Sequence, residues 1–84
     1  MKYVEIYRLE KDGQKKVAEC QLEGTEVKIV GDPGMALMLS KEGIINYSDA
    51  GEQRFFPKDG EKFLEQLKFY FRSGYLNASE IKEK

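Results

Sequence analysis

The chain has 84 residues, a length typical of one domain, and its hydrophobic and aromatic contents of 40% and 12% suffice for a folded core. Its 14 basic and 15 acidic residues leave a formal net charge of −1, which excludes a global attraction to nucleic acid or to anionic membranes. Histidine is absent and Cys20 is the single cysteine, which excludes an intramolecular disulfide, a cysteine-based zinc site and histidine as a general base.

The first third of the chain predicts an antiparallel meander of three strands. The Asp-Gly pair at 12–13 is a strong hairpin signal, because a type I′ turn requires positive φ at both central residues. This turn sets Glu5 opposite Cys20, and a second turn at 23–24 sets Cys20 opposite Val27. Both turns place the same side chains on one face of the sheet, which is therefore the predicted core face. These side chains are Tyr3, Tyr7, Leu9, Ala18, Cys20, Leu22, Val27 and Ile29.

The opposite face of the meander carries charged residues together with Val4, Ile6 and Val17. Apolar side chains outside a predicted core form a patch that a protein partner or a second copy can cover. We therefore include these three residues in a candidate partner surface.

The middle of the chain predicts a short helix and a second, weaker hairpin. Asp32 suits the N-cap of the helix, Pro33 suits its first turn, and Gly43 suits its C-terminal end. The segment MALML is apolar nearly all round, so this helix is expected to be largely buried. The strands of the second hairpin are IINY at 44–47 and EQRFF at 52–56.

A second helix is predicted at about 59–73, capped by Asp59 or beginning at Pro57, and stopped by Gly74. At about 100° per residue its apolar side chains gather on one face. This predicted core stripe contains Phe63, Leu64, Leu67, Tyr70 and Phe71.

Phe69 points away from the core stripe, toward the polar side where Lys62 and Arg72 lie. Two interpretations stay open. Either the C-terminal residues, the second hairpin or the two cationic side chains shelter the ring, or the ring contacts a partner.

These elements predict an α+β fold of order βββα-ββ-α. Its antiparallel sheet combines the three-stranded meander with the second hairpin, and both helices pack on one face of the sheet. Residues 1–78 form the single domain, and residues 79–84 are expected to be a disordered tail. The charged, alternating N-terminus is unlike a signal peptide and no apolar run is long enough to span a bilayer, so we expect a cytoplasmic protein.

Two side chains on the predicted core face have chemical potential. Glu5 near Cys20 is either an acid or base with a raised pKa or, as we favour, a glutamate that reaches solvent. Cys20 is expected to be a buried, unreactive thiol. No motif predicts a metal or a cofactor.

The segment PxDGxxFLxxL at 57–67, followed by SGYLxA at 73–78, resembles the C-terminal signature of a family of small hypothetical bacterial proteins. The resemblance covers about the last third of the chain. It implies no activity, substrate or catalytic residue.

The sequence therefore favours a non-enzymatic domain that binds protein or associates with itself. Its candidate partner surface consists of Phe69, Arg72, Lys62, Val4, Ile6 and Val17. The alternative is a module for single-stranded nucleic acid or RNA, which would use the basic and aromatic residues of the last helix. A third hypothesis is a small-molecule or catalytic site around Glu5 and the tyrosines.

Overall fold

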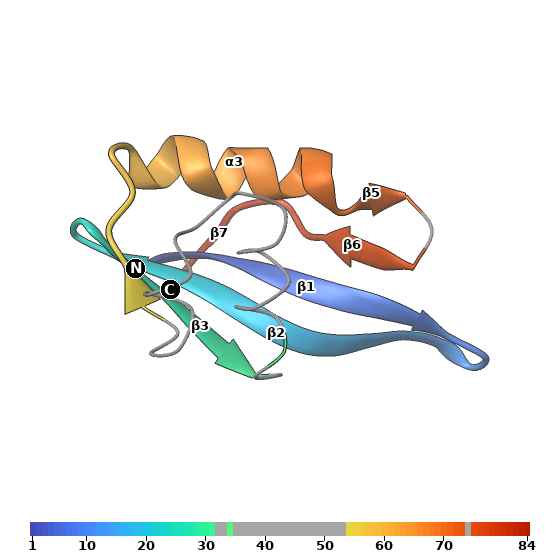
Figure 1. Cartoon of the computed structure of the whole chain (residues 1–84). Coiled ribbons are helices and arrows are strands. Elements are labelled where there is room, and N and C mark those ends of the chain that lie inside the picture. Colours follow the sequence, from blue (N-terminus) through green and yellow to red (C-terminus); the bar gives the residue numbers. More distant parts are fainter. Residues whose placement is uncertain (32–33, 35–53, 74) are drawn as a thin grey trace.

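The computed structural model describes residues 1–31, 34, 54–73 and 75–84, with only the backbone of residues 72 and 73. It is a small α+β fold in which, over these residues, one helix lies on one face of an antiparallel sheet (Figure 1). The helix predicted at 32–43, apart from residue 34, and the strand predicted at 44–47 fall outside the described residues. The described elements are β1 (Lys2–Glu10), β2 (Gly13–Glu23), β3 (Glu26–Gly31), β4 (Arg54–Phe55), α3 (Gly60–Tyr70), β5 (Arg72–Ser73), β6 (Leu76–Ala78) and β7 (Lys82–Glu83).

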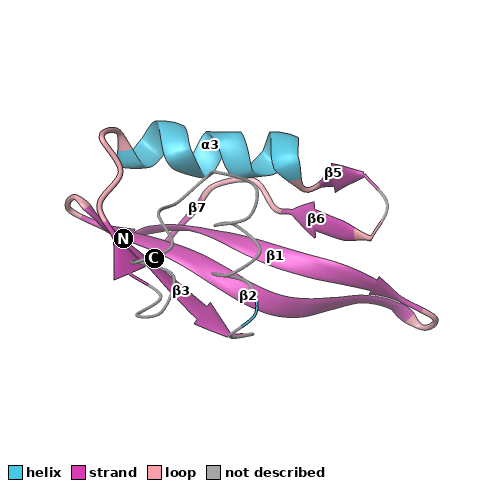
Figure 2. Cartoon of the chain, viewed as in Figure 1, coloured by secondary structure: helices cyan, strands magenta, loops and turns pink. Residues whose placement is uncertain are grey.

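The long hairpin of β1 and β2 forms the middle of the sheet (Figure 2). Within the described residues the strand order is β4-β3-β2-β1-β6-β5, and β7 pairs with β1 on the same edge as β6. Every pair of neighbouring strands is antiparallel. The predicted meander is therefore confirmed, and the C-terminal residues extend it on the other side of β1.

The first hairpin turn lies one position earlier than predicted and the second lies one position later. The side chains of β2 and β3 that were predicted to face the core are nevertheless confirmed. The first loop is 11–12, with Glu10 opposite Gly13, and the second is 24–25, with Glu23 opposite Glu26. Each change moves the pairing by two positions, and a shift of two keeps every side chain on its original face.

A β-bulge at Val17 reverses the predicted face of β1. Tyr7 pairs with Lys16 and Ile6 pairs with Ala18, so Val17 is an extra residue in β2 without a partner in β1. Beyond this bulge Val4, not Glu5, pairs with Cys20. The prediction that Tyr3, Tyr7 and Leu9 belong to the core was therefore wrong.

The core lies between α3 and the face of the sheet that α3 covers. Phe55 and Phe63 join the strand side to the helix side through an edge-to-face contact, with ring centroids 4.8 Å apart. Burying these apolar side chains is the main favourable term in folding. The buried apolar residues are Val4, Ile6, Ala18, Cys20, Leu22, Val27, Ile29, Phe55, Phe63, Leu64, Leu67 and Phe71.

Helix α3 begins where the sequence predicts and ends three residues earlier. The Asp59 carboxylate accepts a hydrogen bond from the backbone N–H of Lys62 at 3.1 Å, which confirms Asp59 as the N-cap. The helix ends at Tyr70 because Phe71 leaves helical geometry, and the Phe71 carbonyl accepts the N–H of Ala78 at 2.8 Å. The chain then forms the β5–β6 hairpin instead of continuing to Ser73.

The C-terminal segment, residues 79–84, is not the disordered tail that the sequence predicted. Its β7 pairs with β1 through Lys2–Glu83 and Tyr3–Lys82, and the N–H of Lys84 bonds the Met1 carbonyl at 2.9 Å. These partners lie about 80 residues away along the chain, so no local pattern in the segment reveals them.

Candidate protein-binding surface

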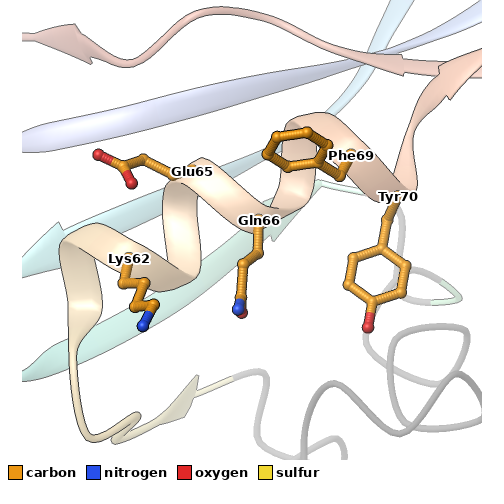
Figure 3. Close-up of a pocket in the computed structure, with 5 residues that line it drawn as sticks. All are labelled: Lys62, Glu65, Gln66, Phe69 and Tyr70. Atoms are coloured by element: carbon orange, nitrogen blue, oxygen red, sulfur yellow. The ribbon is translucent and has the colours of Figure 1, made fainter.

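The outward side of α3 carries an aromatic pair among charged side chains. Figure 3 shows Lys62, Gln66 and Tyr70 pointing to one side of the helix, while Glu65 and Phe69 form a neighbouring row. Both rows follow the spacing of four residues that stacks side chains along a helix. The inner side of the helix is occupied by buried core residues, so these side chains form its solvent side.

Phe69 and Tyr70 are the large apolar residues of this surface. Phe69 is 68% exposed and Tyr70 is 51% exposed. The predicted outward position of Phe69 is confirmed. Tyr70 was placed wrongly in the core stripe, because it lies at the border between the inner and outer sides of the helix.

Phe69 lies between two shallow hollows. The first, of about 470 Å³, is lined by Lys62, Glu65, Gln66, Phe69 and Tyr70. The second, of about 390 Å³, separates the helix from the C-terminal segment. It is lined by Leu64, Glu65, Lys68, Phe69, Ser79, Glu80 and Ile81. We call these two hollows together with Phe69 the α3 surface.

The C-terminal segment forms one wall of the α3 surface. Ile81, 36% exposed, lines the second hollow with Phe69, and Lys68 and Glu80, which also line it, form an ion pair. Sequence reasoning missed Ile81 and Glu80 because it treated the segment as disordered. The bonds of Ser79 to Glu5 and the pairing of β7 with β1 bring them next to the helix.

The structure separates the other residues of the predicted partner surface. Val4 and Ile6 are fully buried in the core, and Val17 is partly buried against the core. Their placement on the far face was wrong, because the bulge at Val17 turns Val4 and Ile6 toward α3. Arg72 lies in β5, and its side chain is outside the described residues. Only Lys62 and Phe69 of the predicted set are described together on the α3 surface.

The basic residues of α3 do not form a continuous positive stripe. Lys68 is paired with Glu80, while Glu61 and Glu65 are exposed on the same helix. The favourable phosphate contacts expected of a nucleic-acid-binding helix are therefore diluted by nearby carboxylates.

A network of ion pairs surrounds Glu5, on the sheet face opposite to Cys20. Lys16 Nζ lies 3.0 Å from Glu5 Oε2 and 2.6 Å from Glu19 Oε2, and Lys82 also bonds the Glu5 carboxylate. Hydrogen bonds from Lys82 and Lys16 lower the pKa of Glu5 to about 2. Glu5 is therefore a permanent carboxylate at neutral pH, contrary to the hypothesis of an acid or base with a raised pKa.

Cys20 is fully buried in the core beside Val4, which confirms the prediction of an inaccessible thiol. Burial raises the pKa of Cys20 to about 12, so the reactive thiolate is scarcely formed at neutral pH.

The described part of the chain contains no group of three or more His, Cys, Asp and Glu side chains arranged to hold a metal ion. Within the same residues, no helix is long and apolar enough to cross a membrane.

Comparisons with protein-family models, with curated proteins and with solved structures found no match to this chain. The arrangement of side chains on the α3 surface is therefore the basis for the functional proposal below.

Proposed function

We propose that this chain is a non-enzymatic domain that binds a protein partner, a second copy included, through the α3 surface. The observation that carries the proposal is the 68% exposure of Phe69 on a helix whose inner side is already filled by Phe63, Leu64 and Leu67. Most of this ring is exposed to solvent in the fold, and a complex can bury it.

The composition of the α3 surface supports this proposal. Full burial of a phenylalanine side chain contributes about 2 kcal/mol, and the neighbouring Tyr70 adds a second ring with a polar end. Aromatic residues surrounded by polar ones are typical of the central residues that dominate binding energy in protein interfaces. Lys62, Glu65 and Gln66 supply such a polar rim.

The experiment compares two phenylalanines of equal exposure. Phe56 is 69% exposed, precedes α3 in the sequence, and lines neither of the two hollows. Phe69→Ser and Phe56→Ser are measured against the unchanged chain by light scattering after gel filtration and by affinity capture with mass spectrometry of retained proteins.

We expect Phe69→Ser to abolish self-association or the retention of a specific partner, while Phe56→Ser leaves both unchanged. Circular dichroism checks that both variants keep the fold. A chain that stays strictly monomeric and retains the same proteins with and without Phe69 contradicts the proposal.

A further inference from the structure

The C-terminal residues follow the outer edge of β1 almost without interruption. After β6, Ser79 occupies the place opposite Glu5: its N–H bonds the Glu5 carbonyl at 2.8 Å, and its hydroxyl accepts the Glu5 N–H at 2.9 Å. Tyr3 then pairs with Lys82. Two residues, Glu80 and Ile81, therefore stand opposite Val4 and bulge out toward α3.

The attachment of this segment uses no buried side chain. All side chains from Glu80 to Lys84 are exposed, and none of them belongs to the core. The segment is held by a short backbone ladder, by the ion pair of Glu80 with Lys68, and by contacts of two lysines. Lys82 bonds Glu5, while Lys84 lies 3.2 Å from Glu19 and 5.0 Å from the centre of the Tyr3 ring. Such contacts are individually weak and sensitive to salt.

The groups that receive these lysines are, in contrast, held by the sheet itself. The side chains of Glu5 and Glu19 are only 12% and 9% exposed, and Lys16 bridges them from β2. Gln21 donates a further hydrogen bond to Glu19 at 2.9 Å. Each of the two carboxylates therefore also has a partner within the sheet that is independent of the C-terminal segment.

We propose that the edge of β1 from Met1 to Glu5 is a binding site for an extended peptide strand with lysines two positions apart, and that the C-terminal segment is its exchangeable occupant. A partner segment would add to the edge as an antiparallel strand, with backbone bonds supplying affinity and the two carboxylates supplying specificity. The edge itself contains no residue of the α3 surface, but its occupant supplies Ser79, Glu80 and Ile81 to the second hollow, so exchange of the segment also removes one wall of that surface.

Backbone N–H groups along β1 point alternately to its two neighbours, so hydrogen exchange can report whether the edge of β1 is covered. The Glu5 N–H points to the C-terminal segment, so the Tyr3 N–H points to it too, while the N–H groups of Val4 and Ile6 point to β2. Hydrogen exchange of Tyr3 and Glu5 followed by NMR therefore reports the edge, and exchange of Val4 and Ile6 in the same sample is the internal control.

The test uses the full chain with Lys82→Glu and Lys84→Glu, which places acidic groups against Glu5 and Glu19. We expect exchange at Tyr3 and Glu5 to accelerate about tenfold or more, with Val4 and Ile6 unchanged. The peptide SEIKEK, with the sequence of residues 79–84, added at millimolar concentration, is expected to restore at least half of the lost protection. The matched peptide SEIQEQ is expected to restore none.

Three results overturn the proposal. Exchange at Tyr3 that does not change in the double variant means that the segment is not held by its lysines. Equal protection by both peptides means that the edge has no preference for lysine. A concentration-dependent dimer of the unchanged chain, lost in the double variant, assigns the edge to a second copy of the chain rather than to a separate peptide.

Discussion

Gly31 lies so close to Val17 that a Cβ atom on residue 31 would be 2.5 Å from the Val17 carbonyl oxygen. Gly31 pairs with Ala18, next to the bulge, and its φ of 123° belongs to a region that residues with side chains rarely adopt. The glycine thus permits β3 to approach the bulged part of β2.

This relationship predicts that Gly31→Ala destabilises the fold more than the same change at Gly13. Gly13 has nearly the same φ, 122°, but nothing lies within 4 Å of a Cβ atom there. Gly13→Ala is expected to cost about 1 kcal/mol for the backbone conformation alone, and Gly31→Ala about 2–4 kcal/mol because the backbone must also move. Urea denaturation measures both. Equal losses of stability would mean that the approach of β3 to the bulge is not tight.

The two sides of α3 are predicted to respond differently to truncation. Leu67→Ala removes a fully buried side chain and is expected to cost about 2–5 kcal/mol in the free energy of unfolding. Phe69→Ala is expected to change it by less than about 0.5 kcal/mol, since the ring is 68% exposed. A large loss at Phe69 in a monomeric sample would show that the ring is buried within the fold.

The low pKa of Glu5 predicts that stability falls in acid. A carboxyl group with a pKa lowered from 4.5 to about 2 binds a proton more readily in the unfolded chain, so its contribution is complete above pH 4.5 and disappears as the pH falls toward 2. Glu5→Gln is expected to cost about 1–2 kcal/mol at pH 7, with the difference from the unchanged chain vanishing near pH 2.

The control for this pH profile is Glu23→Gln, at an exposed position next to the loop between β2 and β3. Thermal unfolding between pH 2 and pH 7 compares the three proteins. A Glu5→Gln variant whose stability stays parallel to that of the unchanged chain over this range would contradict the assigned role of Lys16 and Lys82.

Cys20 is predicted to react with thiol reagents only through unfolding. Its thiol is fully buried, and its pKa is raised to about 12. At pH 8 we expect labelling to be slow, to accelerate with urea along the unfolding curve, and to be rapid in the denatured chain. Rapid stoichiometric labelling of the native protein would show that the core beside Val4 opens.

The sequence predicted the faces of β2 and β3 correctly even though both turns were misplaced. Alternation along a strand has a period of two, so errors of two residues in the pairing leave Cys20 and Val27 on the core side. The N-cap at Asp59 was predictable for a different reason, since capping depends on residues within one turn of the helix.

Which side chains of β1 face the core, and the fact that residues 79–84 are folded, could not be predicted in the same way. A bulge at Val17 has no local signature, because valine is an ordinary strand residue and only the packing of both strands decides which residue is extra. The C-terminal segment is polar and charged, and its pairing depends on Glu5 and Glu19, which are distant in sequence. The surface residues Ile81 and Glu80 were missed for this reason.

The bulge at Val17 also constrains how the length of this hairpin can change during evolution. If the pairing of Tyr7 with Lys16 continued without a bulge, Glu5 would stand opposite Ala18 and Tyr3 opposite Cys20, in place of Ile6 and Val4. Deleting Val17 removes the extra residue and leaves the pairs Ile6–Ala18 and Val4–Cys20 as they are. The hairpin is therefore expected to tolerate the loss of this one residue without a second-site change in length.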